Sequence, residues 1–177
     1  MIRVFSFLLA LLLLPLPATA ALDRQLVAAA ENGDAASQAT LAALYLNAEG
    51  VLRDFDKALY WNIKAAEQGH ARAQTNLGFM YDAGMGVTRD HAAALEWYIK
   101  SAKQGDAIAQ ANIGSLYTEG LGVQRDYAEA LFWFTLAAQS DAVPDAVFAR
   151  DAVALRLDEQ VQGTVHQRVQ SWQSSRK

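Results

Sequence analysis

The residues of this chain that could do chemistry are few and scattered. Its three histidines are His70, His91 and His166. No two of them have the i, i+4 spacing that places a pair of imidazoles on one face of a helix, which is a common arrangement of metal ligands. The sequence therefore predicts no metal site.

Two short motifs have part of the spacing of a catalytic signature, and neither is complete. Gly84-x-Gly86 has the spacing that begins a phosphate loop, but no third glycine is in place and no Lys-Ser pair follows. Ser115 lies within a predicted helix, where the strained turn of a nucleophilic serine does not form, and the chain has no Gly-x-Ser-x-Gly motif. We predict no enzyme, no catalytic residue and no cofactor. A site assembled from distant residues is the alternative that local motifs leave open.

The elements that would position any functional residue form a repeat with a step of 36 residues. Glycine, glutamine, tyrosine, aspartate, leucine and tryptophan all recur at this step. The series are Gly33, Gly69 and Gly105; Gln38, Gln74 and Gln110; Tyr45, Tyr81 and Tyr117; Asp54, Asp90 and Asp126; Leu59, Leu95 and Leu131; and Trp61, Trp97 and Trp133. This predicts three repeats at residues 33–68, 69–104 and 105–140. The Tyr and Trp series are expected to lie in the core.

Each repeat is predicted to contain two helices, which makes the fold an all-α superhelix, or solenoid. In the second repeat, the spacing within residues 71–81 predicts one buried helical stripe, made of Gln74, Leu77, Gly78 and Tyr81. Glycines at Gly84 and Gly86 permit a turn after that helix, and Asp90 is a good cap for the next one. Asp126 with Glu129 three residues later predicts a capping box in the third repeat.

The two ends depart from the repeat, as the caps of a solenoid do. Residues 22–32 are predicted to form an N-terminal capping helix, and residues 144–173 C-terminal capping helices. Asp158 is the expected cap of the last helix. Gly163 inside it costs about 1 kcal/mol relative to alanine, so we expect a close helix crossing there.

Three runs of the second repeat carry a resemblance to a known family. They are Gln74-x-x-Leu77-Gly78-x-x-Tyr81, Gly84-x-Gly86-Val87-x-x-Asp90 and Ala94-Leu95-x-Trp97-Tyr98. They strongly resemble the Sel-one-like repeat, a relative of the tetratricopeptide repeat. The resemblance covers residues 33–140 and implies a right-handed superhelix of paired helices with a concave face, acting as an adaptor or scaffold. Ala48 replaces the first loop glycine of the first repeat, so a less regular loop is expected there.

The face opposite the buried stripe of each first helix is where a ligand would bind. Because a helix turns about 100° per residue, this face can be read from a helical wheel. The candidates are Arg72, Thr75, Asn76, Phe79 and Asp82 in the second repeat, and Ile108, Asn112, Ser115 and Thr118 in the third. Phe79 would be an aromatic anchor, and Arg72 could pair with a carboxylate of the partner. Alternatively, Phe79 fills a gap between repeats and Arg72 is a solvated surface charge.

Asn76 and Asn112 occupy equivalent positions. The resemblance to tetratricopeptide proteins implies that they could bind the terminal carboxylate of a peptide. A position repeated with the period is more often a packing or hydrogen-bonding requirement, and that interpretation is the stronger one.

The first twenty residues predict a secretory signal peptide. Arg3 is their only charge, an apolar run covers residues 4–14, and Ala18-Thr19-Ala20 precedes the expected cut after Ala20. The run is too short to cross the ~30 Å hydrocarbon core of a bilayer. We predict a periplasmic or secreted protein with no membrane segment after cleavage, and an uncleaved anchor is the alternative.

Composition narrows the possible partners. The formal net charge is −4 and basic residues are scattered singly, so nucleic acid is not an expected ligand. The chain has no cysteine, so helix packing alone must hold the exported domain together. We predict a binding protein that takes a protein or peptide on its concave surface as an adaptor, assembly factor or regulator. The alternative is recognition, with or without hydrolysis, of a cell-wall fragment or another small envelope ligand. The sequence predicts neither the partner nor the oligomeric state.

Overall fold

The computed structural model describes residues 22–176, and all regular structure in this range is helical. The helices are α1 (Arg24–Glu31), α2 (Ala35–Asn47), α3 (Phe55–Glu67), α4 (Ala71–Ala83), α5 (His91–Ala102), α6 (Ala107–Glu119), α7 (Tyr127–Ala137), α8 (Ala146–Ala154) and α9 (Glu159–Ser174). The predicted all-α solenoid is confirmed. The predicted signal peptide lies outside the described residues.

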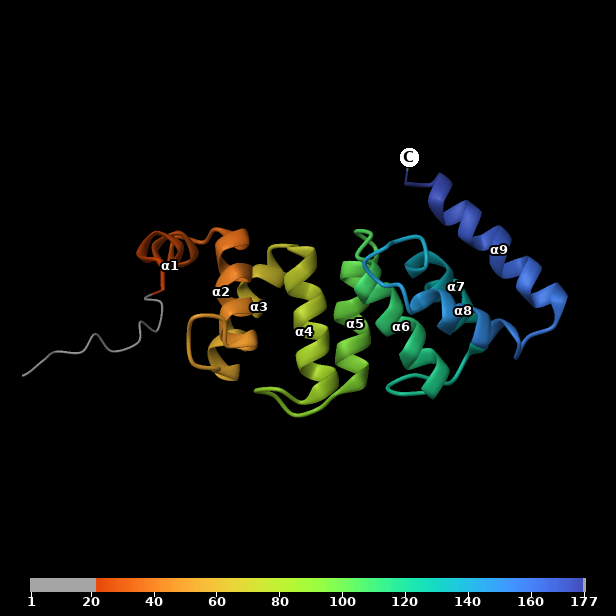
Figure 1. The fold of residues 1–177 in the computed structure, drawn as a ribbon, viewed down its shortest axis with the longest axis horizontal. Coiled ribbons are helices and arrows are strands. Elements are labelled where there is room, and N and C mark those ends of the chain that lie inside the picture. Colours follow the sequence, from red (N-terminus) through yellow and green to blue (C-terminus); the bar gives the residue numbers. More distant parts are fainter. Residues whose placement is uncertain (1–21, 177) are drawn as a thin grey trace, which may run out of the picture.

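The central six helices form three antiparallel pairs, α2–α3, α4–α5 and α6–α7, which follow one another along the long axis of the molecule (Figure 1). Each pair also packs on the next, through α3 against α4 and α5 against α6. Among the described residues, α2 contacts α4 and α4 contacts α6, whereas α3–α5 and α5–α7 contacts are less extensive. The first helices of the repeats are therefore closer together, and the side they share is the concave face.

Short polar side chains begin nearly every helix. The Asp90 carboxylate, for example, accepts hydrogen bonds at 3.0 Å from the backbone N–H groups of Ala92 and Ala93, which have no partner within the helix. The predicted capping box of the third repeat is only half correct. Asp126 caps α7 in the same way, but the side chain of Glu129 is held by Arg168 of α9 instead.

The loop between the two helices of a repeat starts with a residue in the left-handed conformation. Gly84 and Gly120 adopt φ angles of 71° and 75°, and Ala48 takes the same place with φ 62°. The expectation of a less regular first loop is therefore wrong. The loop keeps its geometry, and the alanine bears the strain of a conformation that disfavours a Cβ atom.

A second loop glycine allows the loop of a repeat to contact the backbone of the preceding repeat. A Cβ atom at Gly86 would lie 2.8 Å from the carbonyl oxygen of Phe55, at the start of α3, and one at Gly122 would lie 2.4 Å from the backbone nitrogen of Ala92, in α5. No side chain fits in either gap. These positions require glycine because the loop of one repeat touches the backbone of the repeat before it.

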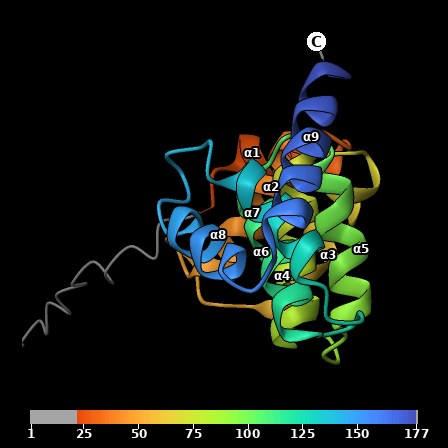
Figure 2. The same ribbon diagram turned by 90° about the vertical axis from the view of Figure 1, so that its right-hand side faces the viewer.

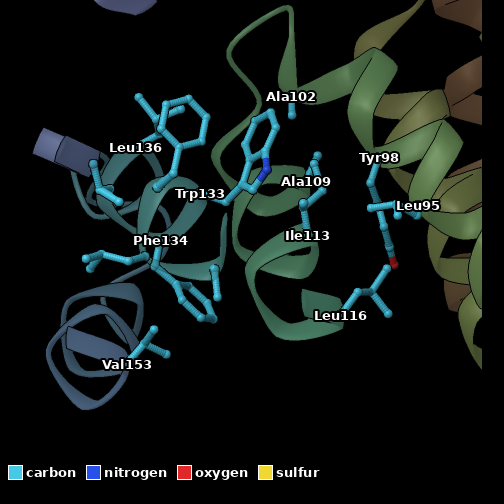
Figure 3. Close-up of a cluster of buried hydrophobic side chains, with 14 of the residues drawn as sticks. Leu95, Tyr98, Ala102, Ala109, Ile113, Leu116, Trp133, Phe134, Leu136 and Val153 are labelled. Carbon is cyan, nitrogen blue, oxygen red and sulfur yellow. The ribbon is translucent and has the colours of Figure 1, made fainter. Parts of the chain in front are cut away.

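Glycines inside helices make room for aromatic rings in the core. The ring of Tyr98 in α5 lies against Gly78 of α4, and the ring of Phe134 in α7 lies against Gly114 of α6. Both rings are buried and belong to the core cluster drawn in Figure 3. The Tyr and Trp series lie at the edge of this core: Tyr81 and Tyr117 pack against it half-buried, and only Trp133 of its series is fully buried.

The C-terminal helices close the array as predicted. Helix α9 lies across its end against α7 (Figure 2), with Val165 and Val169 buried and Trp172 set edge-on against Trp133 at 5.7 Å between ring centroids. The expected close crossing at Gly163 is wrong, because a Cβ atom there would meet no atom within 4 Å.

Candidate functional site

The concave face is formed by the open sides of α2, α4 and α6. Its residues alternate with the buried stripes that face α3, α5 and α7, because each first helix packs against its second helix on one side only. The face is therefore rigidly positioned by the core behind it. It carries most of the residues that the sequence singled out as a binding surface.

A pocket of about 360 Å³ lies on this face between α2 and α4. Its α2 side is made of small apolar residues with a polar end, and its α4 side is polar. The lining residues are Ala36, Ala39, Thr40, Ala43, Leu44, Asn47 and Glu49, together with His70, Arg72 and Asn76. A volume at the small end of the range for ligand pockets suits one or two side chains of a partner.

Arg72 is the free cation of this pocket. Its side chain is exposed, and within residues 22–176 it forms no ion pair. Two other polar groups are already engaged: Nδ1 of His70 accepts from the backbone of Ala73, and Oε1 of Glu49 accepts from Asn47. Arg72 can therefore bind a carboxylate through two parallel N–H groups.

Two large apolar side chains lie beyond the pocket on the same face. Phe79 of α4 and Ile108 of α6 are each 42% exposed, which shows that neither fills a gap in the core. An exposed aromatic residue on a rigid face is the kind of residue that carries binding energy in protein interfaces.

Asn76 and Asn112 differ in their surroundings although the repeat makes them equivalent. Asn76 lines the pocket, whereas Asn112 approaches the phenol of Tyr98. Burial raises the pKa of Tyr98, the negative charge of Asp82 raises it further, and the amide of Asn112 opposes the rise. Of the two asparagines, only Asn76 lines the pocket.

Two of the predicted residues are not available to a partner. Thr75 is only 6% exposed, and its hydroxyl is 2.7 Å from that of Ser101 in α5, so it fastens two helices together. The half-buried carboxylate of Asp82 is bound to the imidazole of His91 at 2.6 Å. The wheel placed both outward because it contains no information about the neighbouring helix.

The remaining predicted residues are polar and lie on α6. The hydroxyl of Ser115 donates to the carbonyl of Ala111, and that of Thr118 to the carbonyl of Gly114. Both bonds are within the helix, and Ser115 is exposed. Neither side chain shows the activated environment of a nucleophile.

The sequence reading missed an exposed apolar stripe on α8. Phe148 and Leu155 are 74% and 87% exposed and lie seven residues apart, on the side of α8 opposite its buried Ala146 and Val153. A wheel drawn for residues 146–155 would have shown it. The histidines, in contrast, stay apart. In the part of the chain that the structure describes, no three histidine or carboxylate side chains gather as metal ligands would.

No helix among residues 22–176 is both long and apolar enough to cross a bilayer.

Comparisons with known proteins identify the repeat. Residues 35–70, 71–106 and 107–141 match the family model of the Sel1 repeat. The fold is similar to the crystal structure of c5321, a protective antigen present in uropathogenic Escherichia coli strains that displays an SLR fold. The identity is 35% and the TM-score 0.77, over 83% of this chain and 31% of that one.

A Sel1 repeat protein from Oxalobacter formigenes is also similar, with 42% identity and a TM-score of 0.56, over 59% of this chain and 42% of that one. This chain thus spans less than half the length of either solved chain. No curated protein sequence matches it.

Proposed function

Because this chain belongs to the Sel1 repeat family, we propose that it is an exported adaptor, assembly factor or regulator that binds a protein or peptide on its concave face. Sel1 repeats generally serve as protein–protein interaction modules. The observation that carries the proposal is the pocket between α2 and α4, where an alanine-lined wall stands beside the unpaired Arg72.

The chemistry of the pocket suggests what the partner presents. Ala36, Ala39 and Ala43 leave space for an aliphatic side chain, and the guanidinium of Arg72 offers two N–H groups to a carboxylate. Phe79 lies one turn beyond Asn76 on α4 and would extend the contact with an aromatic ring. A segment with an acidic residue next to apolar ones fits this arrangement.

The test is affinity capture with a matched pair of variants. Immobilised protein comprising residues 21–177 would be compared with an Arg72→Glu, Phe79→Ala double variant, and captured envelope proteins would be quantified by mass spectrometry. The control is Arg24→Glu, Tyr60→Ala, which makes the same charge reversal and also replaces an aromatic side chain by alanine, at exposed positions of α1 and α3. Circular dichroism would establish that all three forms fold equally.

We expect a partner that the native form and the control hold and that the groove variant loses. Because an anchoring aromatic and a paired arginine each contribute about 2 kcal/mol or more, the loss should exceed about a hundredfold in affinity. Equal capture by all three forms would place the interaction off the concave face. If nothing is captured above a bare matrix, muropeptide binding and hydrolysis, the alternative function, become the next assays.

Export is the second part of the proposal and has its own test. Its support is the charge and apolar pattern of residues 1–20. The full chain would be expressed in a bacterium, and the protein recovered from the periplasm and medium would be sequenced from its N-terminus. Recovery of a chain that begins at Ala21 is expected. Retention of an uncut chain in the membrane fraction would support the anchor instead.

A further inference from the structure

A row of glutamines runs through the three repeats and joins each to the helix before it. Its members are Gln38, Gln74 and Gln110, one in each first helix, all at most 5% exposed. Each donates from Nε2 to a backbone carbonyl at the end of the preceding helix, at 3.0, 3.1 and 3.4 Å respectively. The donor side of every row member is therefore used inside the chain.

The acceptor side of the first two row members is used as well. Gln68 donates from Nε2 to Oε1 of Gln38 at 2.7 Å, and Gln104 donates to Oε1 of Gln74 at 2.8 Å. The same Nε2 of Gln104 also donates to the carbonyl of Gly69 at 2.9 Å. In both repeats a primary amide thirty residues further along the chain donates to the row member, and that of Gln104 also bridges to a glycine carbonyl, whereas that of Gln68 donates to the carbonyl of Lys64.

The third row member lacks this amide. Thirty residues after Gln110 the chain has Ser140, which is too short to reach, and whose hydroxyl accepts from the backbone of Ala142 instead. Within residues 22–176, no group donates to Oε1 of Gln110 or to the carbonyl of Gly105, the counterpart of Gly69. The Gln110 side chain is 95% buried, and its acceptor oxygen lacks the donor that the other two repeats provide.

A pocket of about 330 Å³ stands where the amide would be. Gln110, Gly105 and Ser140 line one part of it, and Trp172 and Arg176 of the C-terminal segment line another. Gln139 and Gln173 also line the pocket, but their amides bond to each other, Gln173 Nε2 donating to Gln139 Oε1 at 2.7 Å. The Arg176 guanidinium donates weakly to the carbonyl of Ala102, at 3.4 Å, and keeps further N–H groups for an acceptor. The aromatic ring of Trp172 can cover an aliphatic chain.

We propose that this pocket binds a primary carboxamide, the glutamine side chain of a peptide or protein partner. Its NH₂ group takes the place that Gln104 takes in the preceding repeat and donates to Gln110 Oε1 and to the Gly105 carbonyl. Its carbonyl oxygen accepts from Arg176, and its methylene groups lie along Trp172. The site is on the far end of the array from the pocket between α2 and α4, so it is a second binding site.

The first test needs no ligand and uses two variants of equal size. Ser140→Gln supplies the missing amide from within the chain, whereas Ser140→Glu places a carboxylate, which cannot donate, in the same position. We expect Ser140→Gln to have the higher melting temperature at pH 7. If the two variants melt together, or if Ser140→Glu is more stable, the inference that the pocket requires an amide donor is wrong.

The second test measures binding directly. The probe is acetyl-Ala-Gln-Ala-N-methylamide, and the comparison is the same peptide with glutamate, titrated into ¹⁵N-labelled protein comprising residues 21–177. We expect saturable shifts of the Gln110 side-chain amide and the Trp172 indole N–H with the glutamine peptide. The glutamate peptide should bind at least about tenfold more weakly, because it leaves Oε1 unpaired beside a second negative oxygen.

Loss of these shifts in Ser140→Gln, with retention in Ser140→Ala, would locate the probe in the pocket. Equal shifts with both peptides, the absence of any shift at saturating peptide, or undiminished binding to Ser140→Gln would overturn the proposal. Since the concave-face variant Arg72→Glu leaves this pocket intact, its binding of the glutamine peptide should be unchanged.

Discussion

Among the glycines inside helices, Gly78 is the position where a single methyl group should do the most damage. A Cβ atom built there would lie 2.6 Å from Cδ1 and 2.7 Å from Cε1 of the Tyr98 ring. Ordinary carbon–carbon contacts are at about 3.5–4.0 Å, so the ring would have to retreat by roughly 1 Å. Tyr98 is 0% exposed, and it is packed on every side. Gly78→Ala therefore forces a shift of the whole α4–α5 contact.

The expected magnitude is the difference of two effects. Overpacking a core usually costs about 1–3 kcal/mol, whereas alanine is favoured over glycine in a helix by about 1 kcal/mol. Because the clash involves the body of a ring, we expect the upper part of the overpacking range and a net loss of about 1–2 kcal/mol. For a domain of this size that lowers the melting temperature by about 2–8 °C.

The assay is thermal and urea unfolding of Gly78→Ala beside Gly163→Ala. The control alanine in α9 meets no atom within 4 Å, so it should gain the helix preference of about 1 kcal/mol without a clash. In a Tyr98→Leu background the Gly78→Ala change should lose most of its cost, since the ring that it strikes is absent. The reasoning is refuted if Gly78→Ala stabilises the native protein as much as Gly163→Ala does.

Three further outcomes follow from other contacts. Ala48→Gly should raise the unfolding free energy by about 0.5–1 kcal/mol, because the left-handed conformation costs an alanine about 1–2 kcal/mol and glycine loses part of this gain as chain entropy. Urea unfolding at pH 7 measures this change, and an unchanged midpoint would contradict the prediction. Burial raises the pKa of Tyr98, so above about pH 10 only the unfolded state loses this proton, and the unfolding free energy should fall with rising pH by up to about 1.4 kcal/mol per unit. Tyr98→Phe should remove that share of the slope, and parallel pH profiles of the two proteins would refute it. Arg168→Ala removes the ion pair with Glu129 and the contact of the guanidinium with the Phe132 ring, whose centroid is 4.1 Å away. Amide hydrogen exchange in α9 should therefore become about two- to fivefold faster, with a smaller effect in high salt. Unchanged protection would show that apolar packing alone holds the helix.

The repeat, the helix pairs and the caps could be predicted because local rules decide them. Asp90 needs only the free N–H groups of the next turn, and that requirement is visible in the sequence. Because the sequence repeats every 36 residues, each local prediction made for one repeat also applies to the other two. The matches of residues 35–70, 71–106 and 107–141 to one family model agree with it.

The errors concern positions whose outcome depends on a distant segment. Glu129 satisfies the rule for a capping box, yet Arg168, on a helix thirty-nine residues away, binds it instead. Thr75 lies on the outward arc of α4, but Ser101 from the next helix covers it. At Gly163 no neighbouring segment approaches closely enough to exclude a Cβ atom, and the structure offers no physical reason for glycine there. Of the predicted groove, Arg72, Asn76, Phe79, Ile108 and Ser115 are accessible to a partner, so the binding hypothesis can be tested on them.

The contacts of the loop glycines give the array a direction. Gly86 touches the backbone of Phe55, and Gly122 touches that of Ala92, so each loop leans on residues that precede it in the chain. During synthesis from the N-terminus, every newly emerged repeat finds the surface it needs already made, and it never has to wait for a later one. A chain that stops after two repeats retains every contact of its last loop, whereas one that starts at the second repeat exposes the bare backbone of Gly86. Gain or loss of repeats by gene duplication should therefore be tolerated at the C-terminal side of the array more readily than at its N-terminal side.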